Sequence, residues 1–327
     1  MGGLGRMLQS RDAVLALILA AMVAAIAQRS PGFASPANLA SVFNDTAILI
    51  ILALGQASVI IARGIDLSVA ANLALTGMIV AMLDNAAPEV PLAALVLIAA
   101  LTGLTLGAVN GVLVWKARIP PIVVTLGTLT IYRGVIFLIS GGEWVNAHEM
   151  SPAFKALPRA VVLGLPTLSW IALAVVALVW LLISRTALGR AFYAVGGNPR
   201  AAVYAGIDVG RTRFAAFVLS GALAGLCGYL WVARYAVAYV DIAGGFELDV
   251  VAACVIGGVS IAGGIGSVPG AVMGALFLGV IKNALPVVNI SPFWQLAISG
   301  TVIVAAVVIN ARQRRDRGRL ILREAHA

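Results

Sequence analysis

Residues 92–114 read LAALVLIAALTGLTLGAVNGVLV, a run of 23 residues without a charged side chain. An α-helix rises about 1.5 Å per residue, so this run is long enough to cross a hydrocarbon layer about 30 Å thick. Gly103, Gly107 and Gly111 stand four residues apart and share one helix face, where a second backbone can approach closely. The run predicts a tightly packed transmembrane helix.

The composition of the whole chain indicates the same class. Of its 327 residues, 61% are hydrophobic and 11% are charged. A soluble domain has about 45–50% apolar and about 25% charged residues. The strands of an outer-membrane barrel alternate over about ten residues, whereas the apolar runs here are long and continuous. We therefore predict an all-α integral membrane protein with a single transmembrane domain, residues 1–327.

Ten apolar runs are candidate transmembrane helices. They cover residues 13–27, 47–62, 67–83, 92–114, 122–139, 168–183, 214–235, 248–261, 268–285 and 293–309. The first run also resembles a cleavable signal peptide, but we expect it to stay as an uncleaved anchor. Gly221 with Gly225, and Gly270 with Gly274, predict two further close-packing faces.

The distribution of basic residues predicts the orientation. Ten crossings place both termini on one side, and Lys and Arg flanking membrane helices are retained in the cytoplasm. With the termini inside, the inner segments hold 16 of the 22 Lys and Arg residues. These are Arg6, Arg11, Arg63, Lys116, Arg118, Arg185, Arg190, Arg200, Arg211, Arg213, Arg312, Arg314, Arg315, Arg317, Arg319 and Arg323. The net charge of +9 is thus explained by basic residues on the cytoplasmic side of the membrane, and it does not indicate a nucleic-acid partner. Residues 1–12, 184–213 and 312–327 are the expected cytoplasmic segments.

The residues that catalysis would need are missing. Cys227 and Cys254 lie inside apolar runs, and His148 and His326 are far apart, so we expect no disulfide and no metal site. None of the three lysines follows a glycine, so the chain lacks the loop that cradles nucleotide phosphates. We expect no catalytic and no cofactor-binding residues in this chain, and we expect that it is not itself an ATPase.

A few polar residues inside or beside the spans are candidates for the translocation path or its gating. They are Asp66, Asn72, Asn110 and Gln295. Asp66 could instead cap the third span beside Arg63, and the amides could instead join helices by hydrogen bonds. The second and eighth spans are short, and each runs into a glycine-containing break, as in carriers built from two related halves.

Two polar segments are candidate docking elements. Asn198 is a good helix N-cap, Pro199 suits the first helical position and Gly206 can end the helix, so the sequence predicts a helix of about two turns. It would present Arg200 and Tyr204 to a cytoplasmic partner or form a plain surface loop. Asp241, Glu247 and Asp249 could receive a delivery protein outside, or cap a helix.

Four ordered motifs carry a family resemblance. They are GIDLSV at 64–69, IPPIVVTLGT at 119–128, GGN at 196–198 and GGVSIAGG at 257–264. Over about residues 38–312 the chain resembles the permease subunits of bacterial ABC importers for ribose-like monosaccharides. Ala70 departs from the glycine that usually ends the first motif. Residues 44–78 and 144–152 are most similar to rhamnose-type permeases.

The resemblance implies a multi-pass protein of the bacterial cytoplasmic (inner) membrane that imports rhamnose or a ribose-like sugar by alternating access. It implies two permease subunits, identical or paralogous, two cytoplasmic ATPase subunits and an extracytoplasmic sugar-binding protein. It makes Gly196, Gly197, Asn198, Pro199, Arg200 and Tyr204 the expected ATPase-coupling residues. The alternative is an ion-coupled secondary carrier, which the scarcity of charges inside the spans disfavours, since Arg133 alone lies well inside one.

Overall fold

The computed structural model describes residues 11–287 and the single positions 294, 297, 300, 301 and 304. Its elements in chain order are α2 (Arg11–Arg29), the 3-10 helix η1 (Pro31–Ala34), α3 (Pro36–Ile61), α4 (Val69–Ala86), α5 (Leu92–Trp115), α6 (Pro121–Ser140), α7 (Pro152–Arg159), β1 (Val161–Val162), β2 (Leu165–Pro166), α8 (Thr167–Arg185), α9 (Ala187–Gly197), α10 (Pro199–Tyr204), α11 (Val209–Tyr235), α12 (Phe246–Ile256) and α13 (Val268–Val287). The two short strands form one antiparallel hairpin in which Val162 faces Leu165.

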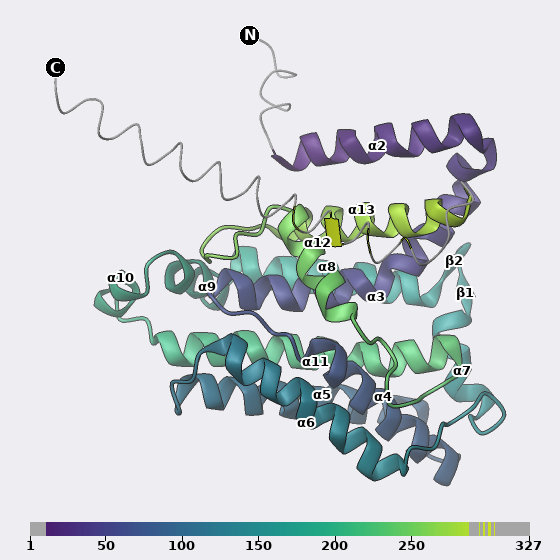
Figure 1. Ribbon diagram of the computed structural model, residues 1–327, viewed down its shortest axis with the longest axis horizontal. Helices are drawn as coiled ribbons and strands as arrows, with labels where there is room; N and C mark the ends of the chain where they lie inside the picture. The colour runs from purple at the N-terminus through teal and green to yellow at the C-terminus, as the bar shows by residue number, and fades with distance from the viewer. Residues whose placement is uncertain (1–10, 288–293, 295–296, 298–299, 302–303, 305–327) are drawn as a thin grey trace.

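The long helices run side by side, with the short elements at the two ends of the bundle (Figure 1). The helices α9 and α10 form one end, and α7 with the β1–β2 hairpin lies at the other. Among the described residues, eight helices are long and apolar enough to cross a membrane, namely α2, α3, α4, α5, α6, α8, α11 and α13. The predicted all-α membrane class is confirmed.

The eighth predicted span, 248–261, differs from a full crossing. Here the structure has the 11-residue helix α12, about 16 Å long, and then a glycine-rich loop. Gly258, two residues after the end of α12, takes a left-handed φ angle of 86°, and Gly263 and Gly264 in the loop take φ angles of 86° and 74°, so the helix does not continue. The tenth predicted span, 293–309, lies largely outside the described residues.

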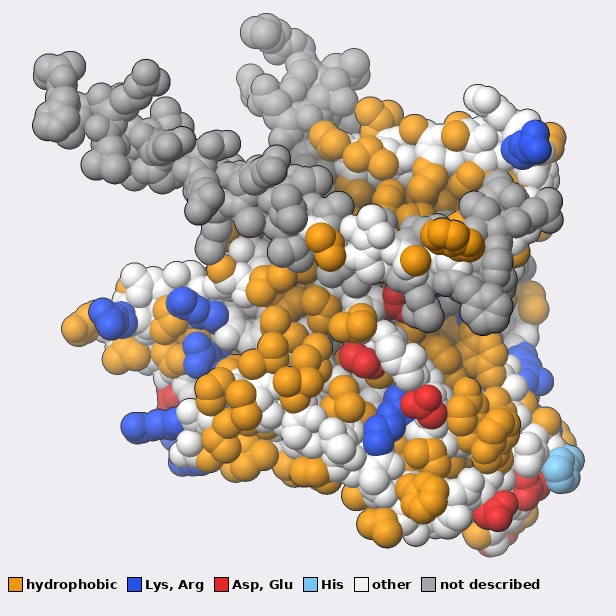
Figure 2. All heavy atoms as spheres, in the orientation of Figure 1, with side chains coloured by type: hydrophobic (Ala, Val, Ile, Leu, Met, Phe, Trp, Pro, Cys, Tyr) orange, Lys and Arg blue, Asp and Glu red, His pale blue; other side chains and the backbone are white. Residues whose placement is uncertain are grey.

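The helix α3 is the core of the bundle, and α6 and α8 lie on its periphery. Residues 46–62 are buried without interruption, as expected for a helix that is apolar on every side. On the peripheral helices, Leu138 and Leu178 are 80% and 65% exposed. Figure 2 shows hydrophobic side chains over much of the flank of the bundle. Such a flank suits contact with lipid chains.

The predicted glycine faces bring helices into backbone contact. A β-carbon on Gly103 would lie 2.3 Å from the carbonyl oxygen of Gly221, and one on Gly225 would lie 2.2 Å from that of Ala99. These contacts join α5 to α11. On α13, a β-carbon on Gly270 would lie 2.2 Å from the Gly257 oxygen. No larger residue fits at these positions unless the helices separate, which confirms the three close-packing faces.

The two glycine-containing breaks meet in space. The first break joins α3 to α4 and the second joins α12 to α13, and the amide of Gly264 donates to the carbonyl oxygen of Ile61 at 2.9 Å. The prediction that the second span is short was wrong, because α3 has 26 residues. The contact between the breaks, which lie in the two halves of the chain, is a property that the sequence pattern only hinted at.

Candidate functional site

Asp66 lies in the first break and is 1% exposed. Its Oδ1 accepts hydrogen bonds from the backbone N and the Oγ of Ser68, at 3.0 and 2.7 Å. Its Oδ2 accepts one from the Oγ of Ser220 on α11, at 3.1 Å. The bonds from Ser68 close a turn directly before α4 begins, and the bond from Ser220 ties that turn to α11. Arg63, the nearest cation in sequence, is exposed.

Asn72 and Asn110 are buried next to this turn. The Nδ2 of Asn110 donates to Ser68 Oγ at 2.8 Å, and the Oδ1 of Asn110 is buried without a hydrogen-bond partner. The Nδ2 of Asn72 donates to the carbonyl oxygen of Gly103 at 3.1 Å, and its Oδ1 accepts from Thr76 at 3.2 Å. We call Asp66, Ser68, Asn72, Asn110 and Ser220 the Asp66 cluster.

The Asp66 cluster joins four parts of the bundle. Its hydrogen bonds connect the first break with α4, α5 and α11. None of its members lines either of the two cavities described below. The structure thus brings together three of the four predicted path residues in a packed layer. The fourth, Gln295, lies outside the described residues, and a role of the set in transport stays a prediction.

The predicted two-turn helix is present as α10. The side chain of Asn198 accepts hydrogen bonds from the amides of Arg200 and Ala201, both at 3.1 Å, which caps the helix. The chain turns at Gly206, whose φ is 77°. Arg200 is exposed and Tyr204 is 92% exposed. The structure adds α9, a second short helix that the sequence analysis did not predict, and the two helices form a projecting tip (Figure 1).

The end of α9 packs against both breaks. A β-carbon on Gly196 would lie 1.7 Å from the Ile61 oxygen and 2.4 Å from the Gly264 nitrogen, and one on Gly264 would lie 2.5 Å from the Gly197 nitrogen. We call Gly196, Gly197, Gly263, Gly264 and the Ile61 carbonyl the glycine junction. The hydroxyl of Tyr193 on α9 donates to the Gly266 oxygen at 2.9 Å. Burial raises the pKa of this phenol above its ordinary value, so it remains a donor.

The three predicted docking carboxylates have different surroundings. The side chain of Asp241 is 82% exposed and lies 3.9 Å from Arg133 Nη1. Glu247 is partly exposed in the first turn of α12. Asp249, in the same turn, forms an ion pair with Lys282 on α13 and its side chain is 15% exposed. Asp241 therefore faces solvent, whereas Asp249 faces the interior of the bundle.

Arg133, the one charge that the sequence analysis placed deep in a span, is hydrogen-bonded to the loop between α11 and α12. Its Nη1 donates to the carbonyl oxygens of Val240 and Ile242, at 2.6 and 2.8 Å. These bonds hold the loop between α11 and α12 against α6. The same loop pairs with the segment after α6 through Val145 and Ala238.

The sequence analysis missed a cavity between α3, α11, α12 and α13. Its volume is about 230 Å³, and we call it the α13 cavity. It is lined by Asp45, Thr46, Ile48, Leu49, Trp231, Tyr235, Phe246, Gly279, Lys282 and Asn283. A second cavity, of about 320 Å³, lies near the ends of α4 and α6. It is lined by Met82, Asn85, Ala86, Ser140, Glu143, Trp144, Val145 and Glu149.

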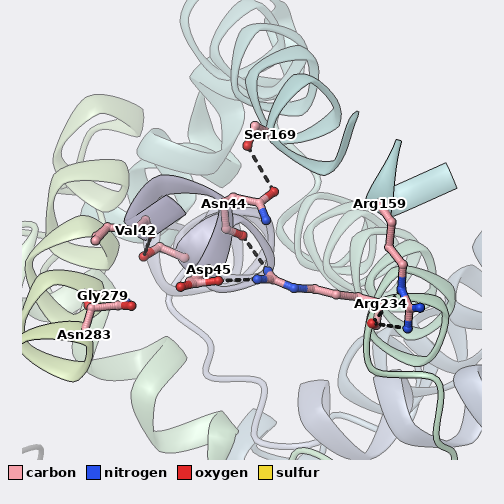
Figure 3. Close-up of polar contacts among 9 residues, drawn as sticks. Val42, Asn44, Asp45, Arg159, Ser169, Arg234, Gly279 and Asn283 are labelled. Carbon is pink, nitrogen blue, oxygen red and sulfur yellow. Dashed lines mark hydrogen bonds and ion pairs between the residues drawn. The ribbon is translucent and has the colours of Figure 1, made fainter. Parts of the chain in front are cut away.

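Two ion pairs stand at the α13 cavity. Arg234 reaches from α11 to α3, where it pairs with Asp45 and donates to the Asn44 oxygen at 2.6 Å (Figure 3). Its own carbonyl oxygen accepts from Arg159 at 2.7 and 3.1 Å. The second pair is Lys282 with Asp249. Figure 3 places Asp45 opposite Gly279 and Asn283 of α13.

Three aromatic rings form another part of the cavity wall. The ring centroid of Trp231 lies 5.1 Å from that of Tyr235 and 5.2 Å from that of Phe246. The charged residues near these rings could have indicated this site from the sequence. Asp45, Arg234 and Lys282 all stand within or beside apolar runs, where a charge is costly unless it is paired. The sequence alone did not reveal which charge pairs with which.

Comparisons with known proteins agree with this architecture. The family model described as the branched-chain amino acid transport system permease component matches residues 38–307. The autoinducer 2 import system permease protein LsrC of Escherichia coli (strain K12 / DH10B) is 35% identical over 315 residues, which cover 96% of this chain and 90% of the relative. The ribose import permease protein RbsC of Haemophilus influenzae is 34% identical over 309 residues, 94% of each chain.

No solved structure matches the chain significantly. The family model spans far more than half of the sequence, and the two relatives align over almost their full length. The chain therefore belongs to this family of transport-system permease components, and it is a multi-pass protein of the bacterial cytoplasmic membrane.

Proposed function

We propose that this protein is the transmembrane subunit of an ATP-driven importer that moves a ribose-like monosaccharide into the cytoplasm by alternating access. In this proposal two permease subunits, identical or paralogous, form the pathway. ATP binds to two cytoplasmic ATPase subunits and not to this chain, and an extracytoplasmic binding protein delivers the solute. The chain itself catalyses no reaction.

One observation carries the proposal, namely the path from the α9–α10 tip through the glycine junction to both breaks. The tip exposes Arg200 and Tyr204 for contact with a partner. At Gly196 and Gly264 the backbone of α9 is in direct contact with the two breaks, with no side chain between them. A push on the tip by a closing ATPase pair would therefore move α3, α4, α12 and α13 together, as a bistable bundle requires.

The charges at the two ends of the bundle support this orientation. Exposed basic residues gather at the end that α9 and α10 form, and Figure 2 shows Lys and Arg side chains there. They include Arg63, Lys116, Arg118, Arg185, Arg190, Arg200 and Arg211. By the retention of positive charge inside, this end is cytoplasmic in our proposal. The opposite end, with Asp241, then faces the binding protein.

The relatives guide the choice of solute. Their names refer to autoinducer 2 and to ribose, whereas the family description refers to branched-chain amino acids. Because the relatives align over almost the whole chain, we place a ribose-like monosaccharide first. Rhamnose, to which the segments at 44–78 and 144–152 pointed, is named in neither relative, so we place it second.

Co-purification from native membranes in mild detergent tests the proposal. We expect a stoichiometric ATPase to accompany the full chain, and the paired substitutions Arg200→Ala and Tyr204→Ala to remove most of it without loss of membrane insertion. Both side chains are exposed, so folding should be preserved. The matched control is Trp144→Ala at the other end of the bundle, where the side chain is 54% exposed.

Two outcomes would contradict the proposal. A chain that purifies alone and takes up solute on an ion gradient would be a secondary carrier. Uptake that continues without ATP and without a delivery protein would indicate a passive channel. Retention of the ATPase by the tip variant would move the coupling contact elsewhere on the cytoplasmic face.

A further inference from the structure

We propose that the α13 cavity is the solute-binding site of the permease, and that it takes one uncharged, polyhydroxylated solute of monosaccharide size. This inference rests on the proposed function. The cavity volume of about 230 Å³ is below the ~300–1,000 Å³ typical of pockets for drug-sized ligands, so it suits a single small molecule.

The position of the cavity suits delivery from outside. Asp45 lies in the first half of α3, Tyr235 is the last residue of α11, and Asn283 lies close to the end of α13. Because α3 runs opposite to α11 and α13, the three positions lie at the same end of the bundle, opposite α10. A solute released by a binding protein at that end would meet this cavity before the packed centre.

The charges at the cavity favour a neutral solute. Asp45 is paired with Arg234, and Asp249 with Lys282, so the two acids and two bases cancel. A solute with full charges would have to break these pairs, which is costly in a partly buried site. Hydroxyl groups can instead bond to the lone pairs that a paired carboxylate keeps and to the Asn283 amide, because a hydroxyl both donates and accepts.

The walls match the two kinds of surface on a sugar ring. Trp231, Tyr235 and Phe246 offer aromatic surface for its C–H faces, and Asp45 and Asn283 offer polar groups for its edge. A mostly apolar wall with a few placed polar groups is the usual composition of a small-molecule site. The second cavity lacks this combination, since two glutamates and Trp144 line it at the surface.

Two helices that form walls of the cavity, α3 and α13, also lead to the glycine junction. Sixteen residues of α3 separate Asp45 from Ile61, a distance of about 24 Å along the helix. α13 begins four residues after Gly264 and carries Gly279 and Asn283 to the opposite wall. A shift at the junction would therefore displace both walls, which gives the cavity different affinities in the two states of the transporter.

Thiol labelling in the assembled complex tests the site directly. Cys227 and Cys254 are both 0% exposed, so a cysteine introduced as Asn283→Cys is the accessible thiol of the described residues. We expect D-ribose to slow its reaction with a maleimide about tenfold at a concentration about ten times the dissociation constant, because about one site in eleven stays empty. L-Leucine should give no protection. The matched control is Asn85→Cys in the second cavity, whose labelling should not respond to sugar.

The outcomes distinguish a failure of the proposed binding site from a failure of the proposed function. Protection by leucine and not by ribose would overturn the neutral-polyol inference. Equal labelling with and without either solute, in a complex that still imports sugar, would overturn the site and leave the proposed function standing. If no ATPase accompanies the chain, the proposed function fails. Ribose protection of the chain alone would then still support the site.

Uptake kinetics give a second measurement. Asn283→Leu keeps the side-chain size and removes the amide, so KM for the sugar should rise about fivefold, the loss expected for one hydrogen bond. Asn283→Gln should restore part of it, and Asn85→Leu should leave KM unchanged. ATPase co-purification should be equal in all three variants. An unchanged KM in Asn283→Leu would contradict the inference.

Discussion

The Asp66 cluster and the α13 cavity each contain a carboxylate, and the two carboxylates differ in their surroundings. In the Asp66 cluster, the carboxylate accepts three hydrogen bonds from serines, is 1% exposed and borders neither described cavity. At the α13 cavity, Asp45 is paired with Arg234, its side chain is 37% exposed and it borders open volume. A polar residue inside a membrane bundle can thus serve packing or solute contact, and the space beside it distinguishes the two roles.

The largest expected effect is on folding, at Asp66. Asp66→Ala leaves Ser68 N, Ser68 Oγ and Ser220 Oγ without their shared acceptor, and we expect the free energy of unfolding to fall by about 3 kcal/mol. Thermal unfolding in detergent and the yield of monodisperse protein would measure this. Normal stability with an altered solute profile would show that Asp66 belongs to the path.

The next effect is on uptake, at Asp45. Asp45→Asn weakens the pair with Arg234, which keeps its bond to the Asn44 oxygen, so stability should change by less than about 1 kcal/mol. Uptake at low sugar concentration should fall about tenfold, because a carboxylate is a stronger acceptor for hydroxyls than an amide. Radiolabelled sugar uptake, normalised to the amount of inserted protein, would measure it. A loss of stability equal to that of Asp66→Ala would remove the distinction between the two sites.

Much of this architecture could be predicted from sequence, because it follows from local patterns. Uncharged runs such as 92–114 predict the membrane class, glycines four apart predict close-packing faces on α5 and α11, and Asn198 with Pro199 predicts the start of α10. Each of these depends on neighbours within a few residues. The turn at Asp66 is also local, because Ser68, two residues later, donates two hydrogen bonds to the Asp66 carboxylate.

The α13 cavity could not be predicted, because its residues come from four helices. Asp45 and Arg234 are 189 residues apart in the chain, and nothing in either run indicates the other as its partner. The glycine junction has the same character, since α9, α3 and the second break meet there. The opposite environments of Asp241 and Asp249 also depend on where α13 carries Lys282.

Asn110 Oδ1, which is buried without a hydrogen-bond partner, allows a more specific test of the Asp66 cluster. Asn110→Leu removes one donor to Ser68 and also removes a buried acceptor that has no partner, so the two effects partly cancel. We expect the free energy of unfolding to change by no more than about 1 kcal/mol, with uptake within about twofold of normal. Thermal unfolding and uptake would be compared on one preparation. A selective loss of uptake at normal stability would mean that this oxygen contacts the solute.

The smallest effect is expected outside the bundle, at Asp241. Its side chain is 82% exposed and 3.9 Å from Arg133, so Asp241→Asn should leave stability unchanged. If it contributes to docking, the ATPase stimulation by solute-loaded binding protein should fall about twofold at low salt, and the difference should vanish at high salt, where exposed charges are screened. Asp249→Asn is the interior counterpart. It removes the carboxylate that pairs with Lys282 beside the cavity, so its effect on uptake should persist at high salt. Equal salt dependence of the two variants would contradict the separation of docking surface from cavity.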